Sequence, residues 1–259
     1  MAHSTGILTA ASLMVAAPAA ADAIERARRL ASLRVGLHIV LVDGRPMLRP
    51  EALPALVDRN GCFRKNMAAA GLRIFVDPAA RRQLAAEITA QFEAYAATGL
   101  PLDHVDCHKH FHLHPTIARL VIEIGRRFGM TALRVPLEPA TALRRIEPQA
   151  SSPQSLVTEW WAERLRARVH GAHLATADRV FGLAWSGAMT EARIAGLLAQ
   201  LPDGVTEIYT HPATANAFTG AALGYRYYDE LAALISPRVV AAAKGSGAAL
   251  KGYSDLLAA

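Results

Sequence analysis

Cysteine is scarce in this chain. The 259 residues include only two cysteines, Cys62 and Cys107. This count excludes a disulfide framework and a metal site built from cysteines alone, and it suits a reducing compartment such as the cytoplasm. Charged residues are also modest at 19%, whereas hydrophobic residues make up 52% of the chain. The chain can therefore bury a large core, which argues against intrinsic disorder.

Several catalytic motifs are absent from the sequence. It contains no Gly-x-Ser-x-Gly elbow, so serine hydrolysis has little support. It has no phosphate-cradling Gly-rich loop with its lysine, and no Gly-x-Gly-x-x-Gly turn follows the first predicted strand. These absences leave nucleotide binding without a recognisable motif and direct attention to the histidines.

Residues 6–20 are apolar and end in alanines, much like the central part of a secretory signal peptide. However, no Lys or Arg precedes them, whereas signal peptides carry a positively charged first region. The stretch is also too short to span a bilayer. We therefore predict the end of a helical turn and a buried strand over residues 7–15, in a protein that stays in the cytoplasm.

The net charge is +6, with a pI near 9.7. The basic residues are spread over Arg-rich segments such as 26–34 and 164–168, without a dense run or interleaved aromatic residues. This distribution argues against nucleic-acid binding. A loose electrostatic attraction to a membrane surface is the interpretation that the charge leaves open.

Histidines are concentrated in one stretch. Five of the ten lie between His104 and Pro115, together with Asp106. In an extended strand alternate side chains share a face, so these five histidines and Asp106 would all lie on one side. Imidazole is the commonest metal ligand, and a neighbouring carboxylate can orient a ring. The pattern predicts a metal or catalytic site; a set of buried, hydrogen-bonded histidines without metal is the alternative.

Strand and helix patterns alternate along the chain, which favours a parallel β/α architecture. Asp77-Pro78 is typical of a helix start, with an N-cap carboxylate before a proline at the first position. Helices are predicted over residues 20–32, 77–98, 115–127, 156–169 and 190–201 and from residue 228. Strands are predicted over residues 34–42, 132–135, 178–184, 206–209 and 248–253, and at the histidine stretch. Residues 43–76 and 138–154 are expected to be loops. The first is expected to be a lid or substrate-binding loop, with a loop that has no functional role as the alternative.

Four motifs resemble those of one enzyme family. Asp106-Cys-His-Lys-His-Phe-His112, followed by Pro115, resembles the Asp-Ser-His-x-His-x-His stretch of YdjC-type carbohydrate deacetylases. Gly36-Leu-His-Ile39 is similar to that family's Gly-x-His strand, and Arg134-Val-Pro-Leu-Glu138 and Glu207-Ile-Tyr-Thr-His-Pro212 are similar to its later strand ends. The fuller agreement, which includes residues 6–15 and 181–187, is closest to the hopanoid-biosynthesis-associated HpnK branch.

The resemblance implies an irregular TIM-like (β/α) barrel in a single domain over residues 1–259. Candidate residues that follow several different strands, as His38, His108, Arg134 and His211 do, fit the active face of such a barrel. The family opens with a strand that ends in Asp-Asp-Phe-Gly, and no Asp-Asp pair occurs in this chain. The resemblance therefore implies a barrel without its first strand, and without the carboxylate ligand and presumed general base which that strand carries.

The resemblance also assigns site residues. His38 and His108 are expected to bind one divalent metal ion. Ligand softness favours Zn²⁺ or another transition metal, whereas the family is usually described with Mg²⁺. His211 is the candidate general acid, with a surface histidine as the alternative, and Asp106 is expected to orient a ring. Candidate substrate contacts are Arg134, Glu138, Trp185, His110 and His112, each with plain packing or a structural ion pair as the alternative.

Together these features predict a metal-dependent hydrolase that removes the N-acetyl group from an N-acetylated amino sugar. In the hopanoid-associated branch the substrate would be an N-acetylglucosaminyl hopanoid, and such a glycolipid substrate also favours a peripheral membrane contact at the inner face of the membrane. Alternatives are a chito-oligosaccharide deacetylase and an inactive homologue that binds sugar or lipid. Whether the chain forms an oligomer is left open.

Overall fold

The computed structural model describes residues 1–150 and 156–256. The chain divides into two compact units, each of which is described by itself. Unit 1 comprises Met1–Thr9, Val135–Trp160 and Ala177–Lys251, and unit 2 comprises Ala10–Arg134, Trp161–Thr176 and Gly252–Ala259. The single domain expected over residues 1–259 stays a prediction.

Unit 2 contains a three-stranded parallel sheet in the order β1-β2-β3. Its strands are β1 (Ala10–Leu13), β2 (Arg34–Ile39) and β3 (Leu102–Cys107). Isolated parallel bridges continue the pairing from Val105 to Leu133 and from Ala132 to Ala175. The predicted strand over residues 132–135 is thus reduced to single bridges. The apolar side chains of Leu37, Ile39 and Val105 are fully buried, so this sheet forms the core of the unit.

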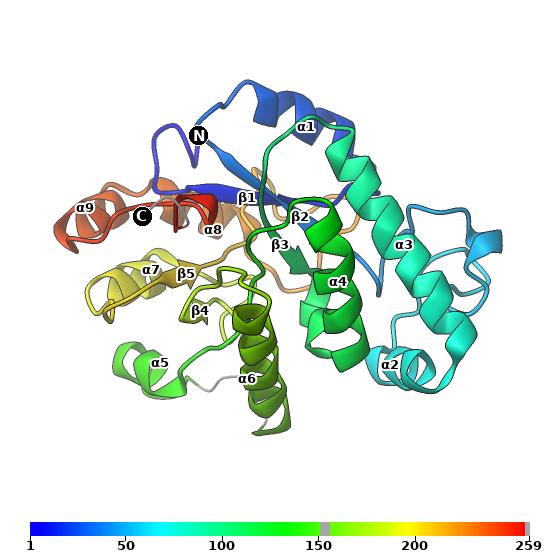
Figure 1. The fold of residues 1–259 in the computed structure, drawn as a ribbon. Coiled ribbons are helices and arrows are strands. Elements are labelled where there is room, and N and C mark those ends of the chain that lie inside the picture. The colour runs from blue at the N-terminus through cyan, green and yellow to red at the C-terminus, as the bar shows by residue number, and fades with distance from the viewer. Residues whose placement is uncertain (151–155, 257–259) are drawn as a thin grey trace. The chain divides into compact units, whose positions relative to one another are not determined.

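Helices cover the sheet of unit 2, and α3 and α4 lie side by side (Figure 1). The helical segments are α1 (Ala20–Arg28), η1 (Pro50–Ala52), α2 (Met67–Val76), α3 (Pro78–Ala96), η2 (His108–Leu113), α4 (Pro115–Arg127), α6 (Leu156–Gly171, which starts in unit 1) and η3 (Ser254–Leu256). The predicted start of α3 is confirmed, because the Asp77 carboxylate accepts a hydrogen bond from Ala79 N at 2.7 Å. Leu84, Ile88 and Phe92 are buried on its inner side, as their spacing predicts.

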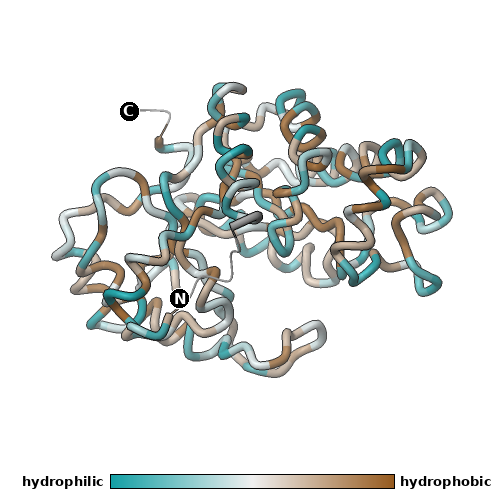
Figure 2. The backbone as a smooth tube through the Cα atoms, turned by 90° about the horizontal axis from the view of Figure 1, so that it is seen from below, coloured by the Kyte–Doolittle hydropathy of each residue, from teal (hydrophilic) through white to brown (hydrophobic). Residues whose placement is uncertain are grey.

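Unit 1 contains a two-stranded parallel sheet and four helices that lie wholly within it among the residues the structure describes. Its elements are α5 (Ala140–Ile146), β4 (Arg179–Phe181), α7 (Glu191–Leu198), β5 (Thr206–Ile208), α8 (Tyr227–Ile235) and α9 (Pro237–Gly245). Phe181, Trp185, Met189 and Ile194 pack into one buried cluster with Leu234. Apolar and polar stretches alternate along the described backbone (Figure 2), as expected for amphipathic elements that bury one face.

Three further predicted segments differ from the structure. The loop predicted over residues 43–76 contains α2, whose start is capped by Asn66 Oδ1 accepting from Ala69 N at 3.0 Å. The loop predicted over residues 138–154 contains α5, with residues 151–155 outside the described part. The last strand predicted over residues 248–253 is wrong, because this stretch has no ladder partner and leads into η3.

The mixed α/β class with parallel strands is as predicted, whereas barrel closure is not shown. Closure requires every strand to pair on both sides. Over residues 1–150 and 156–256 the ladders form two small open sheets, in which β1 pairs with β2 alone and β4 with β5 alone. No helix within these ranges is both long and apolar enough to cross a membrane.

Candidate functional site

Asp106 is the centre of a polar cluster at the end of the unit 2 sheet. It lies opposite His38 in the register of β2 and β3, so the two side chains meet across the strands. His38 Nδ1 donates to Asp106 Oδ1 at 2.9 Å, and Arg134 Nη1 donates to Asp106 Oδ2. The Asp106 side chain is only 1% exposed, so these hydrogen bonds replace the ones that water would otherwise provide.

The charge of Asp106 fixes the tautomer of His38. Burial acts to raise the pKa of Asp106, but the Arg134 guanidinium and His38 hold it well below its usual value. An ionised carboxylate only accepts hydrogen bonds, so His38 Nδ1 must carry the proton. In the neutral ring Nε2 then keeps its lone pair, which is the arrangement found in metal-binding histidines with an orienting carboxylate.

A second chain of hydrogen bonds reaches Asp106 from the other side. Ser12 Oγ, which lies 3.0 Å from His104 Nε2, donates to Asp106 Oδ2 across 3.3 Å. His104 Nδ1 in turn donates to Asp103 Oδ2 at 2.8 Å. Burial acts to raise the pKa of Asp103, but hydrogen bonds from His104 and Ser254 lower it to about 2. Asp103, His104 and Ser12 therefore form a buried support behind Asp106.

Gly36 leaves room for this support. A Cβ atom at this position would lie 2.5 Å from His104 Cε1, which is closer than real side-chain contacts come. The glycine of the Gly36-Leu-His38 motif is thus required by the approach of the His104 ring to the β2 backbone.

The histidines after Asp106 do not share one strand face, contrary to the sequence prediction. The strand ends at Cys107, and Lys109 and His110 both take a φ of 53°, a left-handed conformation rare for residues other than glycine. After Cys107 the chain therefore forms the η2 segment, and its side chains no longer alternate between two faces as they would in a strand. This turn sends His112 into the core, where Nε2 donates to Arg134 O at 2.8 Å, and places His114 at the start of α4.

His108 and His38 are neighbours. Their rings lie 5.7 Å apart between centroids in an edge-to-face arrangement. Burial, followed by the charges of His38 and Lys109, lowers the pKa of His108 to about 4. Its ring is therefore neutral at pH 7 and has a lone pair for a metal. Lys109 beside it bonds to Asp43 Oδ2 at 2.5 Å, which ties η2 to the loop after β2.

These residues fit part of a metal site. Two imidazoles, with one ring oriented by a carboxylate, are suitable ligands for a divalent transition metal. In the part of the chain that the structure describes, no group of three or more His, Cys, Asp or Glu side chains is placed to hold a metal. The structure thus supplies the two expected histidines, His38 and His108, and assigns no third ligand.

The other two predicted histidines of η2 lie deeper. Burial, then Arg134, lowers the pKa of His110 well below its usual value, and burial lowers that of His112 to about 4. The two rings lie 6.4 Å apart between centroids. His112 is fully buried and supports the backbone at Arg134, so its observed contacts are those of a packing residue.

Glu138 and Trp185 belong to unit 1, where both are buried. Glu138 accepts hydrogen bonds from three backbone N–H groups, those of Gly182, Leu183 and Ala184, at 2.8–2.9 Å. Trp185 is 4% exposed, lies in the hydrophobic core and has the Arg193 guanidinium 5.1 Å from its ring centroid. These contacts are structural, and a role in sugar binding stays a prediction for both.

His211 also belongs to unit 1, directly after β5. Its backbone N donates to the buried carboxylate of Glu230, which also accepts from Met189 N at 2.9 Å. Its ring lies among aromatic neighbours, with the Tyr225 ring 5.1 Å away and the Tyr209 ring 5.5 Å away. The backbone and the ring of His211 are thus both held by contacts within unit 1. Its role as a general acid stays a prediction.

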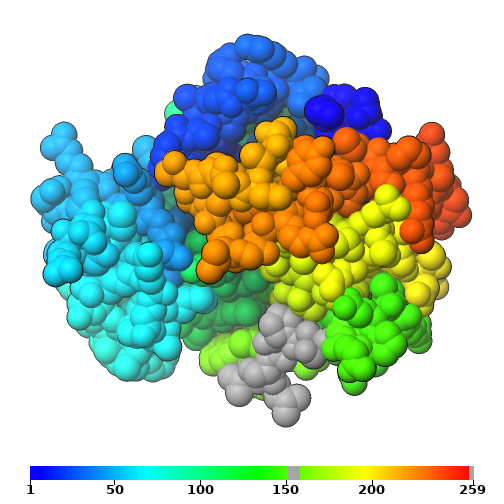
Figure 3. Space-filling model, turned by 180° about the vertical axis from the view of Figure 1, so that it is seen from behind, coloured from blue at the N-terminus to red at the C-terminus, as the bar shows by residue number. Residues whose placement is uncertain are grey.

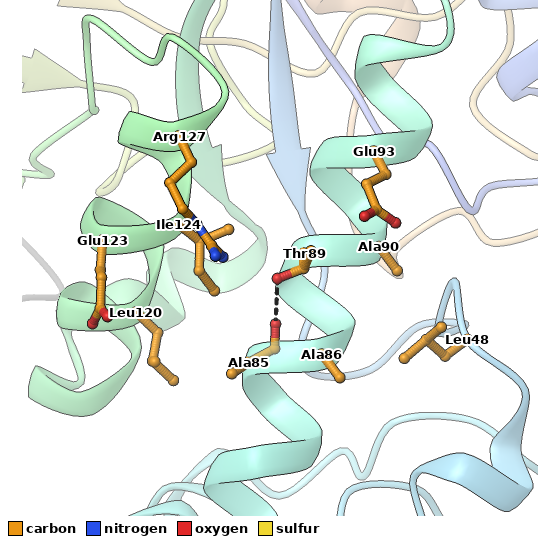
Figure 4. A pocket seen from close by; sticks show the side chains of 10 residues that line it. All are labelled: Leu48, Ala85, Ala86, Thr89, Ala90, Glu93, Leu120, Glu123, Ile124 and Arg127. Atoms are coloured by element: carbon orange, nitrogen blue, oxygen red, sulfur yellow. Dashed lines mark hydrogen bonds between the residues drawn. The ribbon is translucent and has the colours of Figure 1, made fainter.

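A surface groove in unit 2 lies away from these residues. It runs between α3 and α4 (Figure 4). Its lining residues are Leu48, Ala85, Ala86, Thr89, Ala90, Glu93, Leu120, Glu123, Ile124 and Arg127. Thr89 Oγ1 donates to Ala85 O within the helix at 2.9 Å. None of the predicted site residues lines it.

Sequence reasoning missed two members of the cluster, Asp103 and Ser12, and gave His104 only as one of the histidines on the predicted face. Asp103 lies in the strand that carries Asp106, so its proximity to Asp106 offered a signal. Ser12 lies 92 residues before His104 in the chain, in a segment predicted only as a buried strand. Only the parallel pairing of β1 with β2 brings its hydroxyl to the site.

Residues 1–244 match the family model described as "YdjC-like protein", and the chain belongs to this family. It is 30% identical over 258 residues to a protein of Geobacillus stearothermophilus named "Carbohydrate deacetylase", which covers 98% of this chain and 89% of that protein. A Vibrio vulnificus protein of the same name is 36% identical over 127 residues, covering 49% of this chain and 48% of that protein.

The fold has a solved counterpart. A crystal structure from Enterococcus faecalis V583, titled as a cellobiose-phosphate cleavage protein, superposes with a TM-score of 0.76. The two chains are 22% identical, and the superposition covers 98% of this chain and 90% of that one. At this identity the likeness shows the fold alone.

Proposed function

We propose that this protein is a carbohydrate deacetylase that hydrolyses the N-acetyl group of an amino sugar with the help of one divalent metal ion. The observation that carries the proposal is the pair His38 and His108, with Asp106 orienting the His38 ring. The shared family and the name of the Geobacillus relative support the reaction class.

His38 and His108 are the residues that would hold the metal. A bound divalent ion polarises the amide carbonyl and lowers the pKa of water. Zn²⁺ or another transition metal suits the imidazole donors, and Mg²⁺ is the ion that the family resemblance implies. Hydrolysis places a hydroxyl on the acetyl carbon and returns a proton to the leaving nitrogen, so the protein must also remove one proton and supply another.

Asp106 fits an orienting role better than that of a base. Both of its oxygens already accept hydrogen bonds from His38, Arg134 and Ser12. Its pKa is held low, and a carboxylate with a low pKa is a weak proton acceptor. Its contribution is to keep the His38 Nε2 lone pair directed outward.

His211 is the proposed general acid, because a histidine at the end of a strand can exchange protons near neutral pH. His211→Gln should then lower turnover of acetylated substrates, while metal retention by His38 and His108 stays unchanged. Equal turnover in the variant and the parent would remove His211 from the mechanism.

The proposed substrate is an N-acetylglucosaminyl hopanoid, converted to its glucosamine form, and this rests on the resemblance to the hopanoid-associated branch. Free chito-oligosaccharides are the alternative. Acetate release should be measured from both substrates with the metal-loaded protein. Release from the lipid and not from the oligosaccharides supports the hopanoid substrate, and the reverse preference would contradict it while keeping the deacetylase proposal.

A homologue that binds sugar or lipid without turnover is a second candidate. It is favoured by the donor set that the described residues bring together, which is the two histidines His38 and His108. No acetate from any substrate, together with saturable binding of N-acetylglucosamine ligands, would establish this candidate. Acetate release that is lost in His108→Ala, and kept in the exposed control His170→Ala, would exclude it.

A further inference from the structure

The α2 helix has an unusual composition for a helix at the surface. Arg73 is the one polar residue among its ten, Met67–Val76. A helix that is apolar on all sides normally lies inside a protein or in a membrane, because an exposed apolar face gains nothing from water. The outer face of α2 nevertheless lies open.

Only one side of α2 is covered. Gly71 and Ile74 are buried, and a Cβ at Gly71 would lie 3.3 Å from the His114 ring. On the rest of the helix three large side chains at i, i+3 and i+4 spacing form one patch, with exposed fractions of 64%, 60% and 62% for Leu72, Phe75 and Val76. The cyan surface in Figure 3 belongs to this part of the chain.

The segment around this patch is strongly basic. Residues 64–82 contain five basic residues and one acidic residue, a net charge of +4, whereas the whole chain carries +6. The basic residues are Arg64, Lys65, Arg73, Arg81 and Arg82. Lys65, Arg73 and Arg82 are exposed. Arg81 Nη1 donates to Phe75 O at 2.7 Å, which places its charge at the end of α2 beside the patch.

We propose that the outer face of α2 docks on an anionic lipid bilayer surface. Apolar side chains on one side of a helix, with Lys and Arg around them, are the features that hold a helix in the interfacial region of a bilayer. Anionic headgroups attract the basic segment, and Leu72, Phe75 and Val76 enter the boundary between headgroups and acyl chains. A second copy of this chain fits less well, since pairing α2 with α2 would bring two segments of charge +4 together.

The position of α2 connects this surface to the histidine cluster. A Cβ at Gly71 would lie 3.8 Å from the Phe111 ring in η2, and the Phe75 ring lies 6.3 Å from that of His114, the residue that caps α4. The helix that would contact the bilayer, α2, is therefore the same helix that packs against η2, the segment that carries His108. This inference stands on the exposed patch and its charge, and does not require the proposed reaction.

The test is co-flotation of the full chain with vesicles of phosphatidylcholine, with and without phosphatidylglycerol. We expect binding only to the anionic vesicles, and release when the salt rises from about 0.1 M to about 1 M, because the screening length shortens from about 10 Å to about 3 Å. Phe75→Ser should weaken binding about tenfold. Arg73→Gln combined with Arg82→Gln should weaken it through the charge alone.

Leu223→Ser is the matched control, because Leu223 is fully exposed in unit 1 and carries no part of the patch. It should bind vesicles like the parent. Circular dichroism and light scattering on each variant show whether it is folded and monomeric. Failure of the folded parent to bind anionic vesicles, or equal binding to both vesicle types, would overturn the proposal. So would a dimer that Phe75→Ser dissociates, since the patch would then be an interface between copies.

Discussion

Asp106 in unit 2 and Glu138 in unit 1 are both buried carboxylates that follow from the sequence as site candidates, but their partners differ in kind. Asp106 is held by the side chains of His38, Arg134 and Ser12. Glu138 is held by the backbone N–H groups of residues 182–184. One carboxylate positions other functional groups, whereas the other fixes the path of a loop.

This contrast separates two uses of a buried charge. Backbone N–H groups carry no further chemistry, so the hydrogen bonds that a carboxylate accepts from them stabilise structure. Side-chain partners can bind a metal or a substrate, and their orientation depends on the carboxylate. Replacing Asp106 should therefore lower both stability and metal affinity, whereas replacing Glu138 should lower stability alone.

The largest effect is expected for Asp106→Asn. It breaks the buried ion pair between Asp106 and the Arg134 guanidinium, a change that typically costs about 3–5 kcal/mol of stability. It should also weaken metal binding by about 10–100-fold, because His38 loses its orienting carboxylate. Urea unfolding and metal titration measure the two effects.

A double variant separates them. Asp106→Asn combined with Arg134→Met removes both charges and should recover much of the free energy of unfolding, since a buried pair can be replaced by neutral groups at little cost. Metal affinity should stay low. If affinity recovered together with stability, Asp106 would have no orienting role.

Glu138→Ala should lower the free energy of unfolding by about 2–3 kcal/mol, because three backbone N–H groups lose their buried acceptor. Metal affinity should match that of the parent. Asp203→Ala, at an exposed acid of the same unit, is the control and should change stability by less than about 0.5 kcal/mol. A loss of metal binding in Glu138→Ala would remove the distinction between the two carboxylates.

Gly36→Ala should cost about 2 kcal/mol of stability, because the new methyl group would overlap the His104 ring. The displaced ring should also disturb the contact of Ser12 with Asp106, so metal affinity should fall by less than in Asp106→Asn. Gly171→Ala, in a helix with open space around it, is the matched control. Unchanged stability in Gly36→Ala would show that the His104 ring is not fixed at this place.

Stability should also depend on pH between about 6.5 and 4, in a metal-free buffer. The pKa of His108 and of His112 is lowered to about 4 from an unperturbed 6.5, so the unfolded chain takes up protons first as the pH falls. The free energy of unfolding should thus decrease by about 1 kcal/mol for each of these two histidines between pH 7 and 5.5. Glu87 and Glu230, whose pKa burial raises, act in the opposite direction and reduce the slope. A flat profile would show that these histidines are not buried in the neutral form.

Local signals in the sequence predicted much of the fold. Asp77-Pro78 predicted the start of α3, and the structure confirms the cap. The same signature, Ser236-Pro237, starts α9 and was overlooked, although the Ser236 hydroxyl caps Val239 N. The strand expected over residues 248–253 failed because apolar composition alone does not provide a pairing partner.

The candidate site was predicted in composition and not in arrangement. The motif Asp106-Cys-His108 identified the histidines and the acid, since residue type suffices to indicate metal chemistry. Two left-handed residues, Lys109 and His110, then redirect the chain, and propensity gives little warning of such a turn. Ser12 depends on strand pairing across about 90 residues of sequence, which no local pattern encodes.

The most direct test of the account is the metal content of the purified chain after loading and dialysis, compared with His108→Ala and the exposed control His170→Ala. The proposed pair His38 and His108 predicts about one metal per chain in the parent and the control, and loss of that metal in His108→Ala. Equal metal content in the parent and in His108→Ala, or none in either, would contradict it.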